Sequence, residues 1–181
     1  MSFLVRPWAK RDLRDIARLV RELAASHNAL HQVTTSPETL QQDGLGKDPI
    51  FGYLVAEVPP TQKSKDGHTI VGYQFHYPNY CTWFGPVLFG EDLYVMPEFR
   101  GRGIGTALLN GAAKVALEKG CSEFRFISAE KHQPATEFFT KKGAVNVTVR
   151  DAWHVFHIEG DHLVKLVEKA TAKPDPVSLQ L

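Results

Sequence analysis

The chain has 181 residues, 43% of them hydrophobic and 23% charged, which is typical of an ordinary folded domain and not of a disordered or fibrous chain. Its net charge of +1 predicts no general electrostatic attraction toward nucleic acid or an anionic membrane. Two cysteines without a CxxC pair argue against a disulfide framework or a zinc cage, and no stretch approaches the roughly 18 apolar residues of a membrane span.

The ends of the chain bear on its expected organisation. Residues 1–13 contain too short an apolar run for a signal peptide, and no repeat or linker is visible. We expect one cytoplasmic domain over residues 1–170, with neither nucleic acid nor a membrane as a partner. Residues 171–181, which include KPDPVSLQL, are predicted to form a disordered tail.

Hydrophobic periodicity and capping residues predict the elements of the first half. Asp12 precedes apolar positions at near-3.6 spacing, and Ser36 precedes a proline as helix N-caps often do. Apolar runs separated by a polar loop predict strands, and Gly90 predicts a bulge in one of them. In chain order we expect a strand over 2–7, a helix from Asp12 to 24, a helix from Ser36 to 43–44, and strands over 51–58, 69–77 and 86–95.

The second half continues the mixture. A helix is expected over 103–119, ended by Gly120, with an inward side made of Leu108, Leu109, Ala112, Val115 and Ala116. A strand over 122–129, a helix over 134–142, a strand over 153–159 and a last helix from Asp161 follow. Strands and helices mix without strict alternation, which predicts an α/β fold with a mixed sheet and helices on both faces.

The stretch VMPEFRGRGIGT, residues 95–106, places three glycines at alternate positions before the helix over 103–119. Glycine allows positive φ and close approach of a ligand, and a helix N-terminus attracts anions. A Walker loop is excluded because no Gly-Lys-Ser/Thr occurs. The pattern also fits a Rossmann loop poorly, because that loop lies early in a βαβ unit, whereas these glycines lie past the midpoint of the chain and are flanked by two arginines. By spacing alone, the glycines also suit a tight turn before a helix.

The order strand, R-G-x-G-x-G and helix resembles the acetyl-coenzyme A loop of the GCN5-related N-acetyltransferases (GNAT), carried here by Arg100-Gly101-Arg102-Gly103-Ile104-Gly105. Further blocks resemble the spermidine/spermine (diamine) acetyltransferase branch, which includes thialysine acetyltransferases. These blocks are residues 42–44, 54–59, 91–96 and 116–122 and Trp153. The resemblance runs from about residue 3 to 165. It implies the GNAT fold with a mixed, mostly antiparallel sheet, acetyl-CoA as co-substrate, and a homodimer.

The resemblance also implies a coenzyme site. Backbone N–H groups at 101–106 are expected to cradle the pyrophosphate, and the strand 93–95 to pair with the pantetheine arm. The expected coenzyme-binding residues are Leu93, Tyr94, Val95, Arg100, Gly101, Arg102, Gly103, Ile104, Gly105, Thr106, His132 and Ala135.

Amine attack on a thioester needs a proton acceptor and a way to release thiolate. The resemblance implies that Glu91 takes the proton. The family's general-acid tyrosine is replaced by Phe139, which donates no proton, and His132 stands at an asparagine position. Either the thiolate leaves unassisted or through water, or Tyr94 or His132 is the acid, or activity is low or lost. We expect retained activity because the backbone-binding blocks are intact.

The acceptor end departs from polyamine-binding relatives, which carry acidic residues after the first helix. The segment 25–32 has two histidines and no carboxylate, and Cys81 replaces another acidic position. Fewer charged hydrogen bonds make polyamines poor substrates and favour a lysine- or thialysine-like amine. The expected substrate residues are His27, His31, Cys81, Trp83, Glu91, Asp92, Asp151 and Trp153.

Other interpretations remain open at this stage. His27 and His31 would share a helical face, but a third ligand is missing, so no metal is expected. Trp83, Trp153 and Phe156 are expected in the core or in a pocket wall. The alternatives to a small-molecule acetyltransferase are an enzyme for protein N-termini or lysine side chains, and a coenzyme A-binding protein that has lost catalysis.

Overall fold

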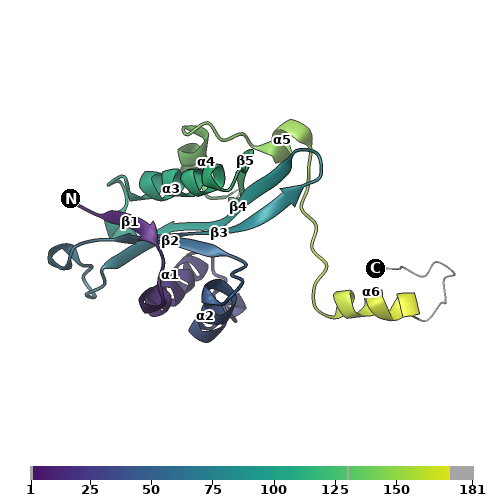
Figure 1. Cartoon of the computed structure of the whole chain (residues 1–181), viewed down its shortest axis with the longest axis horizontal. Helices are drawn as coiled ribbons and strands as arrows, with labels where there is room; N and C mark the ends of the chain where they lie inside the picture. Colours follow the sequence, from purple (N-terminus) through teal and green to yellow (C-terminus); the bar gives the residue numbers. More distant parts are fainter. Residues whose placement is uncertain (1, 130, 172–181) are drawn as a thin grey trace. The chain divides into compact units, whose positions relative to one another are not determined.

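The chain divides after Ala129 into two compact units, and the computed structural model describes residues 2–129 and 131–171 of them (Figure 1). The expected single domain over 1–170 stays a prediction. Residues 172–181 of the predicted tail lie outside the described residues.

The first unit is built on a five-stranded sheet in the order β1-β2-β3-β4-β5. The pairs from β1 to β4 are antiparallel, whereas β4 and β5 run parallel, so the sheet is mixed and mostly antiparallel as predicted. The strands are β1 (Leu4–Pro7), β2 (Gly52–Glu57), β3 (Ile70–Cys81), β4 (Gly85–Val95) and β5 (Glu123–Phe126).

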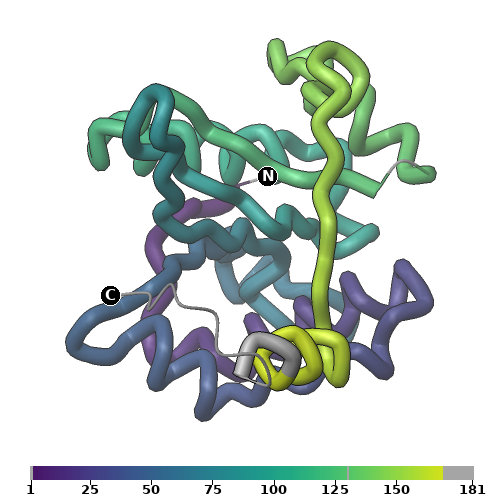
Figure 2. The backbone as a smooth tube through the Cα atoms, turned by 90° about the vertical axis from the view of Figure 1, so that its right-hand side faces the viewer, coloured from purple at the N-terminus to yellow at the C-terminus, as the bar shows by residue number. Residues whose placement is uncertain are grey.

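Helices cover both faces of this sheet. Helices α1 (Leu13–Ser26) and α2 (Pro37–Leu45) lie on one face, and α3 (Ile104–Glu118) lies on the other (Figure 1). Figure 2 shows the sheet and the helices on its two faces after a turn of 90°. Four 3-10 turns connect these elements, namely η1 (Lys10–Asp12), η2 (Leu30–Gln32), η3 (Pro60–Gln62) and η4 (Pro97–Phe99).

The core forms where the helices press on the sheet. Ile16 and Leu19 of α1 and Leu108 of α3 are fully buried, because their 3.6-residue spacing keeps them on the sheet-facing side. The predicted inward residues of α3 are confirmed: four are buried, and Val115 packs against them while half-buried. Ser36 caps α2 as predicted, since its hydroxyl accepts a hydrogen bond from Thr39 N–H at 3.2 Å.

Asp12 has a different task from the predicted one. It precedes α1, but its side chain makes no capping bond to that helix. The buried carboxylate instead accepts from Ala9 N–H at 2.8 Å and from both terminal nitrogens of Arg6 at 2.7 and 2.9 Å. Arg6 also donates to Glu57 at 2.7 Å, so this ion pair ties β1 and β2 to the start of α1.

The second unit contains α4 (Gln133–Thr140), α5 (Val147–Asp151) and α6 (Asp161–Thr171). The predicted strand over 153–159 is wrong, because the described chain gives this segment no hydrogen-bonded strand neighbour. Trp153 and Phe156 are 60% and 87% exposed, so neither is part of the expected core. Helix α5, absent from the expectations, begins with Asn146 accepting from Val149 N–H.

Candidate active site

The register of β3 and β4 shifts at the centre of the sheet. Phe75 pairs with Asp92 and His76 pairs with Gly90, so Glu91 is an extra residue and forms a bulge. Its neighbour Gly90 had predicted such an irregularity. A bulge re-aims side chains, and the consequence here is that Glu91 and Asp92, although consecutive, both contact tyrosines of one face of β3.

Asp92 is the inner carboxylate. It accepts a hydrogen bond from the Tyr73 hydroxyl at 3.2 Å. Burial raises the pKa of Asp92, and the nearby Glu91 adds to this, while the Tyr73 hydrogen bond and His27 act in the opposite direction. A cationic group placed beside Asp92 would therefore gain a strong electrostatic interaction.

Aromatic rings form the floor around Asp92. Tyr53 lies 5.7 Å from Tyr73 and 4.8 Å from Phe75 between ring centroids, and Phe51 lies 5.1 Å from Phe75. Burial raises the pKa of Tyr73 well above its usual range, and Asp92 contributes to this shift, so the Tyr73 hydroxyl stays protonated and acts as a donor. An apolar and aromatic floor with a carboxylate suits the carbon chain and ammonium group of a small amine.

Glu91 is the outer, exposed carboxylate. Its Oε2 accepts a hydrogen bond from the Tyr77 hydroxyl at 3.3 Å. Burial and then the charge of Glu91 raise the pKa of Tyr77. Sequence reasoning missed Tyr77, although its position four residues after Tyr73 on the same strand places it on the same face.

Tyr94 lies on the same face of β4. Its hydroxyl donates to Glu22 of α1 at 3.2 Å, and Glu22 in turn pairs with Arg18 at 2.6 Å. Burial, followed by the charge of Glu22, raises the pKa of Tyr94. The hydroxyl is thus engaged with α1, and the suggested acid role of Tyr94 stays a prediction. Glu22 was also missed, because nothing in its sequence context links it to residue 94.

The glycine loop has the backbone conformation that its sequence predicts. Gly101 and Gly103 have φ values of 73° and 86°, and a Cβ at either position would meet only open space. Gly103 is the N-cap of α3, so no side chain covers the free N–H groups of the first turn. Open space, positive φ and uncapped amides fit a bound pyrophosphate.

The two arginines of the loop are held by local contacts. Arg100 Nε donates to the Val95 carbonyl at 2.9 Å, and its guanidinium lies 5.7 Å from the Tyr94 ring. Arg102 lies 5.4 Å from the Phe99 ring. Both arginines stay exposed beside the glycines and add positive charge there.

A gap in strand pairing lies between the loop and the bulge. Strand β5 pairs with β4 only from Val87 to Gly90. The stretch from Glu91 to Val95 has no strand neighbour on that side among the described residues. Its backbone groups are therefore available to an extended ligand, as expected for the pantetheine arm. The residues present fit acetyl-CoA, whose bound thioester supplies the acetyl group.

The opposite face of the bulge holds a buried polar pair. Gln74 Nε2 donates to the Phe75 carbonyl, at the register shift, and Gln74 Oε1 accepts from His76 Nδ1–H at 2.8 Å. Burial, followed by the charge of Lys119, lowers the pKa of His76 to about 4, so the ring is neutral at pH 7. Gly52 and Gly90 make the room: an added Cβ would approach His76 at 2.7 Å and Gln74 Nε2 at 3.1 Å.

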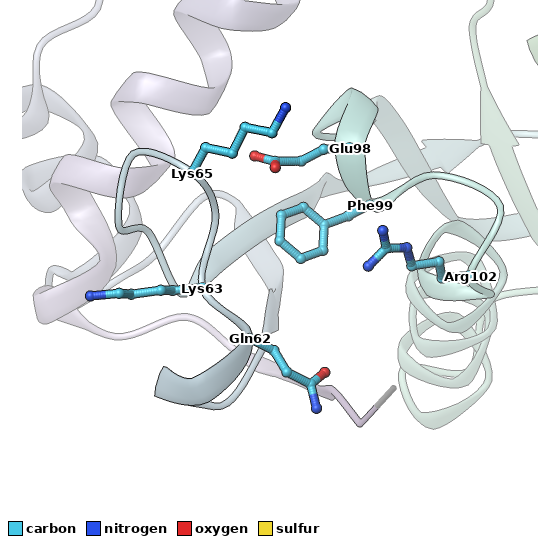
Figure 3. A pocket seen from close by; sticks show the side chains of 6 residues that line it. All are labelled: Gln62, Lys63, Lys65, Glu98, Phe99 and Arg102. Carbon is cyan, nitrogen blue, oxygen red and sulfur yellow. The ribbon is translucent and has the colours of Figure 1, made fainter.

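A cavity of about 590 Å³ adjoins the glycine loop, away from Glu91 and Asp92 (Figure 3). Its lining residues are Gln62, Lys63, Lys65, Glu98, Phe99 and Arg102. Three cations against one carboxylate leave this rim positive, which favours the approach of an anionic coenzyme to the loop.

The remaining predicted residues are spread over the chain. Cys81 and Trp83 lie at the β3–β4 turn, about 20 Å along β4 from Glu91 at ~3.3 Å per residue, so one copy does not bring them to the carboxylates. His27 and His31 do not share a helical face, because α1 ends at Ser26 and His31 lies in η2.

Five predicted residues lie in the second unit. His132 precedes α4, Ala135 and the half-buried Phe139 lie within it, Asp151 ends α5, and Trp153 follows in the extended segment. Asp151 pairs with its neighbour Arg150, whose hydrogen bond holds the pKa of Asp151 below its usual value. Their roles at the site stay predictions.

The described residues contain neither a cluster of metal-binding side chains nor a helix that could span a membrane. Within residues 2–129 and 131–171, no three His, Cys, Asp or Glu side chains gather closely enough to hold a metal ion. None of the described helices is both long and apolar enough to cross a membrane. The expectation that no metal takes part stays a prediction.

Comparison with known proteins identifies the group to which the chain is related. Residues 16–144 match the acetyltransferase (GNAT) family. The chain belongs to the acetyltransferase (GNAT) family. It is 39% identical to the thialysine N-epsilon-acetyltransferase of Sus scrofa over 168 residues, covering 93% of this chain and 99% of that protein.

Two further relatives of this GNAT chain agree. It is 32% identical to the Homo sapiens spermidine/spermine N(1)-acetyltransferase-like protein 1, covering 91% of this chain and 24% of that protein. The aminoglycoside N-acetyltransferase AAC(6')-Iy in complex with CoA has the same fold, with a TM-score of 0.61 and 19% identity over 88% of this chain and 95% of that one. The predicted family, branch, fold and acetyl-transfer activity are confirmed.

Proposed function

We propose that this GNAT enzyme transfers the acetyl group of acetyl-CoA to a primary amine of a small molecule. The observation that carries the proposal is the β4 bulge, which sets exposed Glu91 and half-buried Asp92 side by side on one face. The strand then leads to the uncapped N-terminus of α3. The 39% identity to a thialysine N-epsilon-acetyltransferase supports an amine of that size.

The chemistry assigns each carboxylate a task. Glu91 accepts a proton from the substrate ammonium, and the free amine attacks the thioester carbon. A C–N bond forms, the C–S bond breaks, and coenzyme A leaves as thiolate, which takes up the second proton that the acylated nitrogen loses, directly or through water. Asp92 binds a cationic group of the acceptor against the aromatic floor. Lysine- and thialysine-like amines are favoured over long polyamines because the segment 25–32 has no carboxylate to hold further ammonium groups.

The proposal extends to assembly and location. We infer a homodimer, since the expected substrate residues Cys81 and Trp83 lie far from Glu91 in one copy and a second copy could supply them. We also infer that the enzyme acts in the cytoplasm. Size-exclusion chromatography with light scattering measures the assembly, and a monomer that is fully active would contradict it.

The direct test is turnover of acetyl-CoA across a panel of diamines, polyamines, amino acids and peptides, followed by thiol release. Saturable thiol release with lysine or thialysine is expected, and release only with peptides would overturn the small-molecule assignment. Because Phe139 stands where the family has its general-acid tyrosine, the alternative is a coenzyme A-binding protein without catalysis. In that case acetyl-CoA binds while the wild type and Phe139→Tyr are inert on every amine.

A further inference from the structure

Tyr77 of β3 donates a hydrogen bond to Glu91, the proposed base. Its ring stacks with Phe89 at 5.2 Å between centroids and an interplanar angle of 26°, and it lies 6.0 Å from Phe75. These contacts hold the ring between two neighbours, so its hydroxyl projects to a defined place. That place is 3.3 Å from Glu91 Oε2.

The bulge explains why a second tyrosine is needed. Without the extra residue, alternation would turn Glu91 and Asp92 to opposite faces, and one tyrosine would suffice for the one carboxylate on this face. With it, both carboxylates share a face, and β3 offers one hydroxyl to each: Tyr73 to Asp92 and Tyr77 to Glu91.

The titratable groups around Glu91 come from three elements. Tyr77 on β3 and Asp92 on β4 interact with Glu91 itself, whereas Tyr73 on β3 and His27 after the end of α1 interact with Asp92. Of these, Tyr77 is the one whose hydrogen bond to Glu91 the structure records. Glu91 is otherwise exposed on a bulge, where a carboxylate without a partner samples several rotamers.

We propose that Tyr77 is a positioning residue that orients the base Glu91 toward the amine through its hydroxyl. The proposal rests on the acetyl-transfer function inferred above and adds a residue to it.

Tyr77→Phe tests this, since it keeps the ring and removes the donor. We expect kcat to fall on the order of tenfold, because a misaligned base loses rate, while the KM for acetyl-CoA stays unchanged. Tyr80→Phe is the matched control: the same chemical change on the same strand, at a side chain that is 70% exposed. It should alter neither quantity.

A double-mutant cycle separates Tyr77 from the base itself. In Glu91→Gln, adding Tyr77→Phe should change kcat by less than about twofold, because the hydroxyl then has no base to orient. Losses that multiply would overturn the proposal while leaving the proposed function intact. If Glu91→Gln alone is as fast as wild type, Glu91 is not the base and the role of Tyr77 falls with it.

A second variant covers the case in which Tyr77→Phe does not fold. Site-specific 3-fluorotyrosine at position 77 keeps the hydroxyl and makes it a stronger donor. Because the donor to Glu91 is retained, kcat should stay within about twofold of the wild-type value. A tenfold loss of kcat in a folded fluorinated enzyme would overturn the proposal.

Discussion

Glu91 and Asp92 are adjacent in the sequence, yet their surroundings differ. Glu91 is exposed and bound by Tyr77, whereas Asp92 is held by Tyr73 above an aromatic floor. Burial raises the pKa of Asp92, so folding disfavours its charge until a cation binds beside it. At the scale of residues, the site therefore separates a solvated carboxylate, the proposed base, from a largely desolvated one, which is proposed to bind a cation.

Asp92→Asn should show this separation as a trade-off. Because the pKa of Asp92 is raised on folding, its ionisation lowers stability as pH rises above about 4, the ordinary range of a carboxyl group. The variant should be more stable than wild type at pH 7 in urea unfolding, with the difference vanishing at low pH. The KM for the amine should rise about tenfold or more. A variant that is less stable at pH 7 would contradict this account.

Gly103→Val tests the anion cradle. A branched residue at φ 86° is strained and places methyl groups where the pyrophosphate is proposed to lie. Gly120→Val is the matched control, since Gly120 has φ 70°, equally open surroundings and a place at the other end of α3. Both should lose stability, but only Gly103→Val should lose acetyl-CoA affinity, by calorimetry, on the order of a hundredfold. Equal affinities in the two folded variants would mean that the coenzyme does not bind at the glycine loop.

At the scale of elements, the bulge of β4 depends on packing behind it. The Gln74–His76 pair lies on the face opposite the two carboxylates, and Gln74 satisfies the Phe75 carbonyl where the register shifts. Since a buried carbonyl without a donor is costly, this pair stabilises the irregular strand at the point where Glu91 must protrude. Gly52 and Gly90 are the positions that leave space for it.

Gly90→Ala should disturb the bulge. The added Cβ would approach the Phe124 ring at 2.9 Å and Gln74 Nε2 at 3.1 Å, and Gln74 could move away only at the cost of its hydrogen bonds to Phe75 and His76. We expect a loss of about 1–3 kcal/mol in the free energy of unfolding, together with a lower kcat.

The control for this variant is Gly111→Ala, where the new Cβ meets the flexible end of Leu54 at 2.8 Å, in a helix and away from the bulge. It should lose less stability and keep its kcat. Equal kcat values in the two variants would show that the bulge does not depend on this space.

At the scale of the first unit, the Arg6–Asp12–Glu57 cluster joins the first two strands to α1. Burial alone would raise the pKa of Asp12, but the hydrogen bonds from Arg6 and Ala9 outweigh it and hold the pKa below its usual value. The lowered pKa means that Asp12 stabilises the fold above its unfolded pKa of about 4, and that this contribution disappears as pH falls through the folded value.

Asp12→Asn should therefore destabilise the protein by about 2 kcal/mol at pH 7, because it leaves the partly buried Arg6 with only part of its charge compensated. The gap between variant and wild type should narrow as the pH falls below about 4. Urea unfolding at several pH values measures it, with the exposed turn variant Asp66→Asn as control. A pH-independent gap would mean that packing, and not charge, is responsible.

The sequence by itself determined what depends on local chemistry. Positive φ at Gly101 and Gly103, the cap at Ser36, the inward side of α3 and the irregularity near Gly90 all follow from nearest-neighbour sterics and 3.6- or 2-residue periodicity. Resemblance to the family then predicted the roles of Glu91 and the glycine loop, because a short motif can be recognised from the order of its residues alone.

The tertiary structure alone decided which residues meet. The partners Tyr77 of Glu91, Tyr73 of Asp92 and Glu22 of Tyr94 come from 14 to 72 positions away, and the register of β3 on β4 sets two of these pairs. The predicted strand over 153–159 failed for the same reason. A strand exists only when a neighbour accepts and donates its backbone hydrogen bonds, and no local pattern specifies that neighbour.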